Sequence, residues 1–110
     1  MKMILLLGIN EVVEEYAENV LKIDIRNDIV YYPDVTTHHT ELGQFVDIAR
    51  EEEPPVITTQ SLEMVDVLLN SDLYFEVVTV RRYDNEIKSR TMTKEDVIDC
   101  REKFNFDPRD

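Results

Sequence analysis

Histidines, one cysteine and several carboxylates are the residue types in this chain that could carry out catalysis or bind a metal. His38 and His39 stand close to Asp34 and Glu41, a set that could supply metal ligands. Adjacent histidines usually point apart and no second group of ligands follows, which favours a solvated loop. Cys100 with either histidine could form a nucleophile–base pair. No catalytic signature surrounds it on its predicted helix, so a half-buried structural thiol is favoured.

Basic residues gather in one stretch of an otherwise acidic chain. Arg81, Arg82, Lys88 and Arg90 are four of the 12 basic residues and fall within ten positions. A hairpin that turns at Asp84-Asn85 would bring them close together. Two interpretations stay open. The hairpin is an exposed element balanced by neighbouring acids, or it is a docking surface for an acidic partner or a nucleic-acid strand. The acidic helix Glu11–Glu18 could also meet this hairpin in a neighbouring copy.

The length and charge of the chain limit its class. The 110 residues fit a single domain, 1–110, and the formal net charge is −12 from 24 acids and 12 bases. So negative a chain is poorly suited to general nucleic-acid binding or to docking on anionic membranes. The apolar start, Met3 to Leu7, is too short to span a membrane and lacks the pattern of a signal peptide. The single cysteine fits a reducing compartment, so we expect a cytoplasmic protein. We also expect a protein partner or self-association.

Apolar spacing predicts alternating strands and helices. Residues 3–8 form a continuous apolar run, typical of a strand covered on both faces. Helical spacing follows from Val12 to Leu21, with Asn10 as its expected cap. The remaining expected elements are an extended stretch over 23–32 broken near 27–28, a helix over 40–50, a strand over 56–59, a helix over 62–69 capped by Ser61, and strands over 74–80 and 86–92. Thr93 and Asp96 resemble a capping pair at the start of a last helix, whose stripe would carry Val97, Ile98, Arg101 and Phe104. An irregular tail is expected over 105–110.

This alternation predicts the fold class. Strands separated by helices form mainly parallel sheets with helices on both faces, and the two late strands form an antiparallel hairpin. We therefore expect an α/β domain built in this way.

A segment in the second half resembles a known family. Thr58-Thr59-Gln60-Ser61, between a β-branched strand and an amphipathic helix, is similar to the T-T-H-S motif of AAA-type ATPases of the ABC class. Residues 81–87 resemble the late hairpin of that family, and residues 93–107 resemble its final helix and terminal pattern. The resemblance implies a degenerate P-loop-NTPase-like three-layer arrangement. It also implies that Gln60 occupies the position that approaches the γ-phosphate, and that Thr59 and Ser61 beside it are candidate cofactor-binding residues.

The phosphate-binding loop that such an ATPase needs is absent from the sequence. The loop requires glycines for close approach of backbone N–H groups, a lysine for the phosphates and a hydroxyl for Mg²⁺. Strand 3–8 and Gly8-Ile9-Asn10 resemble the start of such a loop. Glu11-Val12-Val13-Glu14-Glu15 follows instead, and its carboxylates would repel a triphosphate.

The acids that hold Mg²⁺ are also missing. In the related ATPases an apolar strand ends in two acids, whereas Tyr31 and Tyr32 stand at that place here, followed by Pro33, Asp34 and His38 as partial matches. A tyrosine cannot replace a metal-bound carboxylate at neutral pH. Gln60 replaces the motif histidine and retains only a hydrogen-bond donor.

Three functions follow as hypotheses. The first is a non-catalytic ATPase-like domain that serves as a binding, regulatory or assembly module and has no cofactor. The second is an ATP-binding or ATPase component whose phosphate-binding loop comes from a partner chain, so that ATP and Mg²⁺ bind only with that partner. The third is an unrelated small enzyme that uses Cys100 or the histidines. All three agree that this chain alone is no self-sufficient ATPase.

Overall fold

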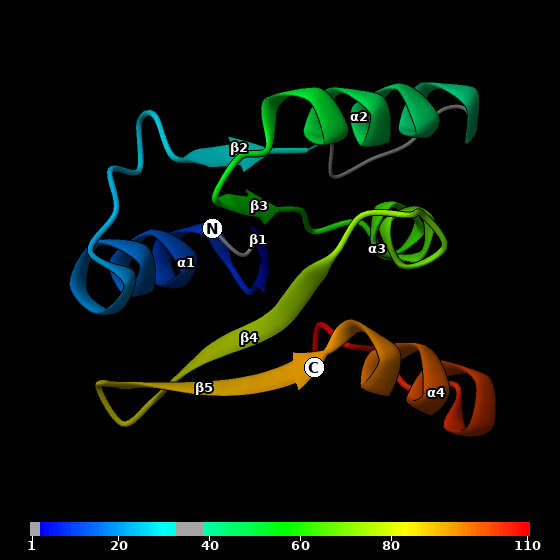
Figure 1. Ribbon diagram of the computed structural model, residues 1–110. Coiled ribbons are helices and arrows are strands. Elements are labelled where there is room, and N and C mark those ends of the chain that lie inside the picture. Colours follow the sequence, from blue (N-terminus) through cyan, green and yellow to red (C-terminus); the bar gives the residue numbers. More distant parts are fainter. Residues whose placement is uncertain (1–2, 33–38) are drawn as a thin grey trace.

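The computed structural model describes residues 3–32 and 39–110, and within them the chain forms one five-stranded sheet (Figure 1). The strand order is β2-β3-β1-β4-β5. The strands are β1 (Met3–Leu7), β2 (Ile29–Tyr31), β3 (Val56–Thr58), β4 (Phe75–Tyr83) and β5 (Glu86–Thr93). The first strand of the chain is therefore the central strand of the sheet.

Four strands run parallel and the fifth is antiparallel. Strand β1 pairs in parallel with β3, where Leu5 lies opposite Ile57, and with β4, where Leu7 lies opposite Thr79. Strand β2 pairs in parallel with β3, and β5 pairs antiparallel with β4. Asp84 and Asn85 both have positive φ and close the hairpin in two residues, as the sequence predicts. The predicted mainly parallel sheet with a late hairpin is confirmed.

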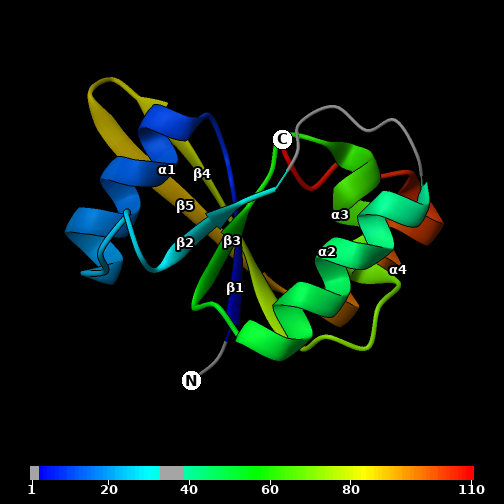
Figure 2. The same cartoon turned by 90° about the horizontal axis from the view of Figure 1, so that it is seen from above.

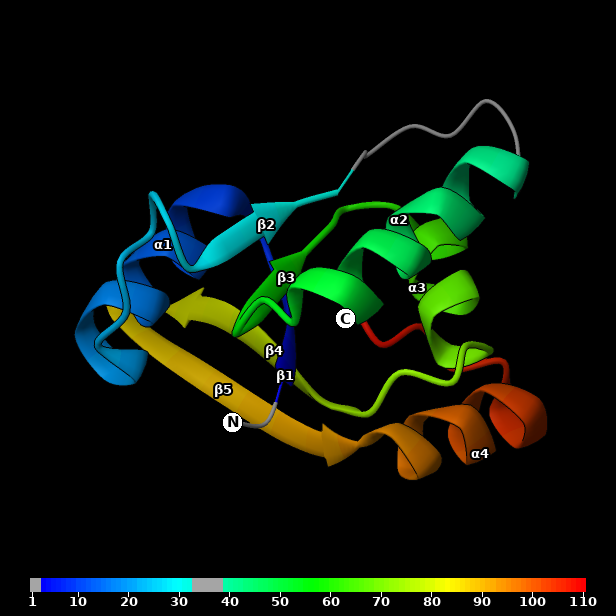
Figure 3. The same ribbon diagram turned by 45° about the horizontal axis from the view of Figure 1, so that its top comes forward.

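Helices cover both faces of the sheet (Figure 2). Helix α1 (Asn10–Tyr16) continues into a π-helical turn, η1 (Ala17–Leu21), on one face. Helices α2 (His39–Glu52), α3 (Leu62–Leu69) and α4 (Lys94–Phe104) lie on the other. The tilted view shows the same three layers, with the sheet between them (Figure 3). The helix-on-both-faces prediction is confirmed.

Each face of the sheet has its own apolar core. Leu5 and Leu7 point toward the α2–α3–α4 layer and pack with Ile57, Leu68 and Val97. The intervening strand positions point the other way. Leu6, Val56, Val78 and Val80 pack there with Val12 and Val13 of α1. Burial of β1 on both faces explains its unbroken apolar run, because no strand position faces water.

Several predicted details are wrong. Asn10 is the first helical residue and not the cap, and Ile9 precedes it without a side-chain capping bond. Residues 23–26 belong to no strand, because the Asp24 carboxylate accepts bonds from Arg26 N at 2.9 Å and Asn27 Nδ2 at 2.7 Å, and this favours a turn. The turn covers residues 25–28 and includes the break predicted near 27–28. Phe104 is 76% exposed at the end of α4 and does not join the core.

The predicted caps of the last two helices are confirmed. Ser61 Oγ accepts a bond from Met64 N at 3.2 Å, and Thr93 Oγ1 accepts one from Asp96 N at 3.1 Å. Within residues 3–32 and 39–110, no helix is both long and apolar enough to cross a membrane.

Candidate functional site

The carboxyl ends of the parallel strands bring together the positions that the sequence singles out. Gly8 follows β1, Tyr32 follows β2 and Gln60 follows β3, and these three strands are neighbours in the sheet. In open α/β sheets this edge is the usual place for a ligand. We call it the carboxyl edge.

Gly8 packs too closely against β4 to carry a side chain. A Cβ atom built on Gly8 would lie 2.7 Å from the Val80 carbonyl oxygen and 2.9 Å from Val80 Cγ2. Its φ of +155° is also one that residues with side chains rarely adopt. Packing against β4 therefore explains why a glycine stands here, without any phosphate contact.

The Gln60 side chain bridges the end of β3 to the end of β1. Gln60 Nε2 donates to the Gly8 carbonyl oxygen at 2.5 Å and lies 3.4 Å from Asn10 Oδ1. Both contacts are to the segment that would be the phosphate-binding loop of an ATPase. The Gln60 amide is thus directed at the chain itself.

The two hydroxyl residues beside Gln60 have structural roles. Thr59 and Ser61 are only 2% and 7% exposed. Thr59 Oγ1 accepts a bond from Ser61 N at 3.1 Å, and Ser61 Oγ caps α3. The preceding hydroxyl, Thr58 Oγ1, is buried and has no hydrogen-bond partner in the described part of the chain.

Tyr31 and Tyr32 are both committed to hydrogen bonds within the protein. Tyr31 Oη donates to Glu14 Oε1 at 2.7 Å, and Tyr32 Oη donates to the Phe45 carbonyl oxygen at 2.8 Å. Burial and the Glu14 carboxylate raise the pKa of Tyr31 to about 12, and burial with the charge of Glu52 raises that of Tyr32 to about 12. Both phenols stay protonated at neutral pH and cannot act as anionic metal ligands.

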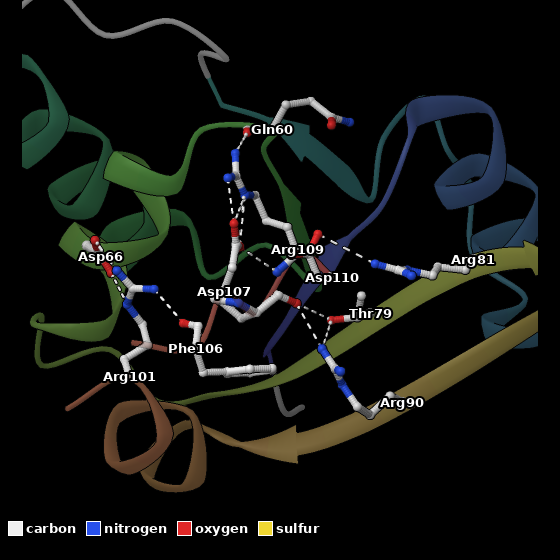
Figure 4. A network of polar contacts seen from close by, with 11 residues as sticks. Gln60, Asp66, Thr79, Arg81, Arg90, Arg101, Phe106, Asp107, Arg109 and Asp110 are labelled. Atoms are coloured by element: carbon white, nitrogen blue, oxygen red, sulfur yellow. Dashed lines mark hydrogen bonds and ion pairs between the residues drawn. The ribbon is translucent and has the colours of Figure 1, made fainter. Parts of the chain in front are cut away.

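The C-terminal tail, predicted to be irregular, is held across the carboxyl edge (Figure 4). Arg109 donates to the Gln60 carbonyl oxygen at 3.0 Å and pairs with Asp107 at 2.6 Å. The Pro108 carbonyl oxygen accepts bonds from Thr79 Oγ1 at 2.6 Å and Arg90 at 3.2 Å. Sequence reasoning gave no role to Thr79 or Arg109, because side-chain bonds to backbone carbonyls follow no spacing rule.

The tail therefore joins the carboxyl edge to the hairpin. Arg101 strengthens this attachment from α4, with bonds to the Phe106 carbonyl oxygen at 2.6 Å and to Asp66 of α3 at 2.6 Å. Phe106 in turn lies under the Arg90 guanidinium, whose carbon is 4.9 Å from the ring centre.

The basic cluster is divided between the two faces of the hairpin. Arg81 lies opposite Lys88, and Arg90 lies opposite Thr79, whose hydroxyl binds the tail. Side chains alternate along a strand, so these cations share the tail side of the sheet. Arg82 points to the other face and forms an ion pair with Glu15 of α1. The prediction that all four cations form one cluster is therefore wrong for Arg82.

The three cations on the tail side, Arg81, Lys88 and Arg90, have few carboxylate partners. Arg81 reaches Asp110 at 3.5 Å, and Arg90 bonds to a carbonyl, a hydroxyl and an aromatic ring. Lys88 forms no ion pair with any residue that the structure describes. A hollow of about 200 Å³ lies among these cations, with Asp110 and Tyr83 also in its wall.

A second hollow of about 420 Å³ lies between the start of α1 and β4. Its wall includes Gly8 and three arginines, Arg81, Arg82 and Arg109. Two of these arginines are neutralised by the chain, since Arg82 pairs with Glu15 and Arg109 with Asp107.

The other candidate residues form no site in the described chain. Cys100 is half-buried on α4, as predicted for a structural thiol. The positions Pro33, Asp34 and His38 and the side chains of His39 and Glu41 lie outside the described residues. Among those described, no group of three or more histidine, cysteine or acidic side chains could hold a metal ion.

Comparisons with protein-family models, with curated proteins and with solved structures found no match to this chain.

Proposed function

We propose that this chain is a non-catalytic, ATPase-like domain that serves as a binding or assembly module. The observation that carries the proposal is the bond from Gln60 Nε2 to the Gly8 carbonyl oxygen. It ties the T-T-Q-S segment to the segment that would otherwise surround the phosphates.

The strand order supports descent from a nucleotide-binding scaffold. A triphosphate site needs its phosphate-binding loop, its Mg²⁺-binding acids and its γ-phosphate contact around one point. The residues that the resemblance assigns to these roles end β1, β2 and β3, and β3 lies between the other two. They therefore meet at one edge of the sheet, as such a site would require.

The side chains at this edge support the absence of catalysis. Tyr31 and Tyr32 are neutral and bonded within the protein, so they offer no charge to Mg²⁺. Glu14 of α1 accepts a bond from the neutral Tyr31 and adds negative charge near the edge, whereas Glu15 is paired with Arg82. A triphosphate would have to displace these contacts and meet carboxylates of its own sign.

Calorimetry of the purified chain with ATP and Mg²⁺ tests the proposal. We expect no binding heat up to millimolar nucleotide, because the edge offers neither a phosphate-binding lysine nor Mg²⁺-binding acids. Micromolar binding by the chain alone would overturn the proposal. Binding only in the presence of a co-purifying chain with a complete glycine–lysine loop would favour the partner-dependent ATPase instead.

A further inference from the structure

Strand β5 leaves one backbone edge of the sheet without a neighbour. It is the last strand in the order β2-β3-β1-β4-β5 and is eight residues long. Figure 1 shows no element beyond it, and no described residue forms a backbone hydrogen bond to it from outside its pairing with β4. Its outward N–H and C=O groups can therefore pair with an added strand.

Two of the three exposed charged side chains on one face of β5 are basic, Lys88 and Arg90, with Glu86 as the third, in a chain of net charge −12. Lys88 and Arg90 are exposed on β5, and Arg81 lies opposite Lys88 on β4. Lys88 has no ion-pair partner among the described residues, and the partners of Arg90 are neutral. An extended segment that carries carboxylates on alternate residues would place them beside these cations while its backbone pairs with β5.

We propose that the β5 edge binds an acidic, extended peptide segment of a partner protein by strand addition. This inference rests on the proposed function as a binding module and names the surface and the chemistry of the partner. Backbone bonds to β5 supply the pairing, and Lys88, Arg81 and Arg90 select for acidic side chains.

The same cations disfavour a second copy of this chain as the occupant. A two-fold antiparallel pairing of β5 with itself centred on Arg90 places Arg90 opposite its own copy. Centred on Lys88, the pairing places Lys88 opposite its own copy, although Arg90 then lies opposite Glu86. Centred on Ser89, the pairing places Lys88 opposite Arg90. Like charges directly opposite each other destabilise a strand pair, so an acidic strand is the better match.

A labelled eight-residue peptide of alternating glutamate and valine is a suitable probe, with the lysine–valine peptide as its control. We expect the acidic peptide to raise fluorescence polarisation and to shift the NMR amide signals of residues 87–91. The lysine peptide should do neither. Binding should weaken as salt is raised, because exposed charges contribute to it.

Two charge-reversal variants distinguish an effect of this surface on binding from an effect of the protein's overall charge. Lys88→Glu should weaken acidic-peptide binding about fivefold, since it replaces an attraction with a repulsion at an exposed site. Arg26→Glu makes the same charge change at an exposed residue before β2, and it should leave affinity within about twofold. Circular dichroism should show that both variants are folded.

Four results would overturn the inference. These are no binding of the acidic peptide, equal binding of the acidic and basic peptides, equal weakening by the two reversals, and amide shifts confined to residues outside β4 and β5. If a single-stranded oligonucleotide binds more tightly than the acidic peptide and its binding depends on Lys88, the partner is a nucleic acid and not an acidic peptide. If neither the acidic peptide nor ATP binds the chain, only the proposed β5 surface is rejected. If ATP binds the chain, the proposed function itself is rejected.

Discussion

The carboxyl edge and the β4–β5 hairpin adjoin each other, but they differ in whether their polar side chains are bonded to other parts of the chain. At the carboxyl edge, Gln60, Tyr32 and Arg109 are all bonded to other parts of the chain. On the hairpin, Lys88 is exposed without an ion pair to any described residue, and Arg81 reaches its carboxylate only at 3.5 Å.

This difference separates a structural role from a binding role. Part-buried polar groups that are bonded internally hold strands together, and a ligand must break those bonds to enter. Exposed cations without close carboxylates contribute little to folding and remain available to a partner. The resemblance directs attention to the carboxyl edge, but the groups free to bind lie on the hairpin.

The largest expected effect is at Gly8. Gly8→Ala should lower the free energy of unfolding by about 3 kcal/mol, because the new Cβ meets the Val80 carbonyl oxygen at 2.7 Å in an unfavourable backbone conformation. Urea denaturation measures this change. Gly43→Ala is the matched control, since open space surrounds Gly43 in α2 and alanine favours helices; it should stabilise by up to about 1 kcal/mol. Similar effects at the two glycines would contradict the close packing of β1 and β4.

A smaller effect is expected at Gln60. Gln60→Ala removes the donor to the Gly8 carbonyl oxygen and should destabilise the protein by about 1 to 2 kcal/mol. In the same denaturation series, Lys88→Ala on the open hairpin should change stability by less than about 0.5 kcal/mol. If the two substitutions lower the free energy of unfolding equally, the carboxyl edge and the hairpin do not differ in how their polar side chains stabilise the fold.

The smallest effect concerns the attachment of the tail in acid. The Arg109 guanidinium holds the pKa of Asp107 below its ordinary value of 3.8. Because the folded pKa is lowered, this pair stabilises the protein above about pH 3.8 and the contribution is lost as pH falls through the lower folded value. NMR signals of residues 105–110 should report loosening of the tail in that acidic range. Asp107→Asn should abolish that pH dependence, and an unchanged titration in this variant would exclude Asp107 as its source.

The order and type of the elements could be predicted from the sequence, because local patterns determine them. The apolar run of β1, the Asp84-Asn85 turn and the Ser61 and Thr93 caps all depend on neighbours within four residues. The helix over 40–50 was predicted two residues short at its C-terminal end, because α2 continues to Glu52 and ends where Glu53 adopts a positive φ.

The arrangement of the site depends on contacts between distant residues and could be predicted only in part. Parallel-strand reasoning places Gly8 and Gln60 at one edge, but nothing in the sequence indicates that Gln60 binds the Gly8 carbonyl, 52 residues away. Strand alternation alone could have placed Arg82 on the opposite face from Arg81. The role of Arg109 follows no local pattern, since its partner is a backbone oxygen 49 residues away.

The central place of β1 also determines when the protein can fold during synthesis. Both neighbours of this first strand, β3 and β4, are translated some 50 and 70 positions later. The nascent chain must therefore carry an unpaired, wholly apolar strand until β3 and β4 have left the ribosome, and such segments invite aggregation or chaperone binding.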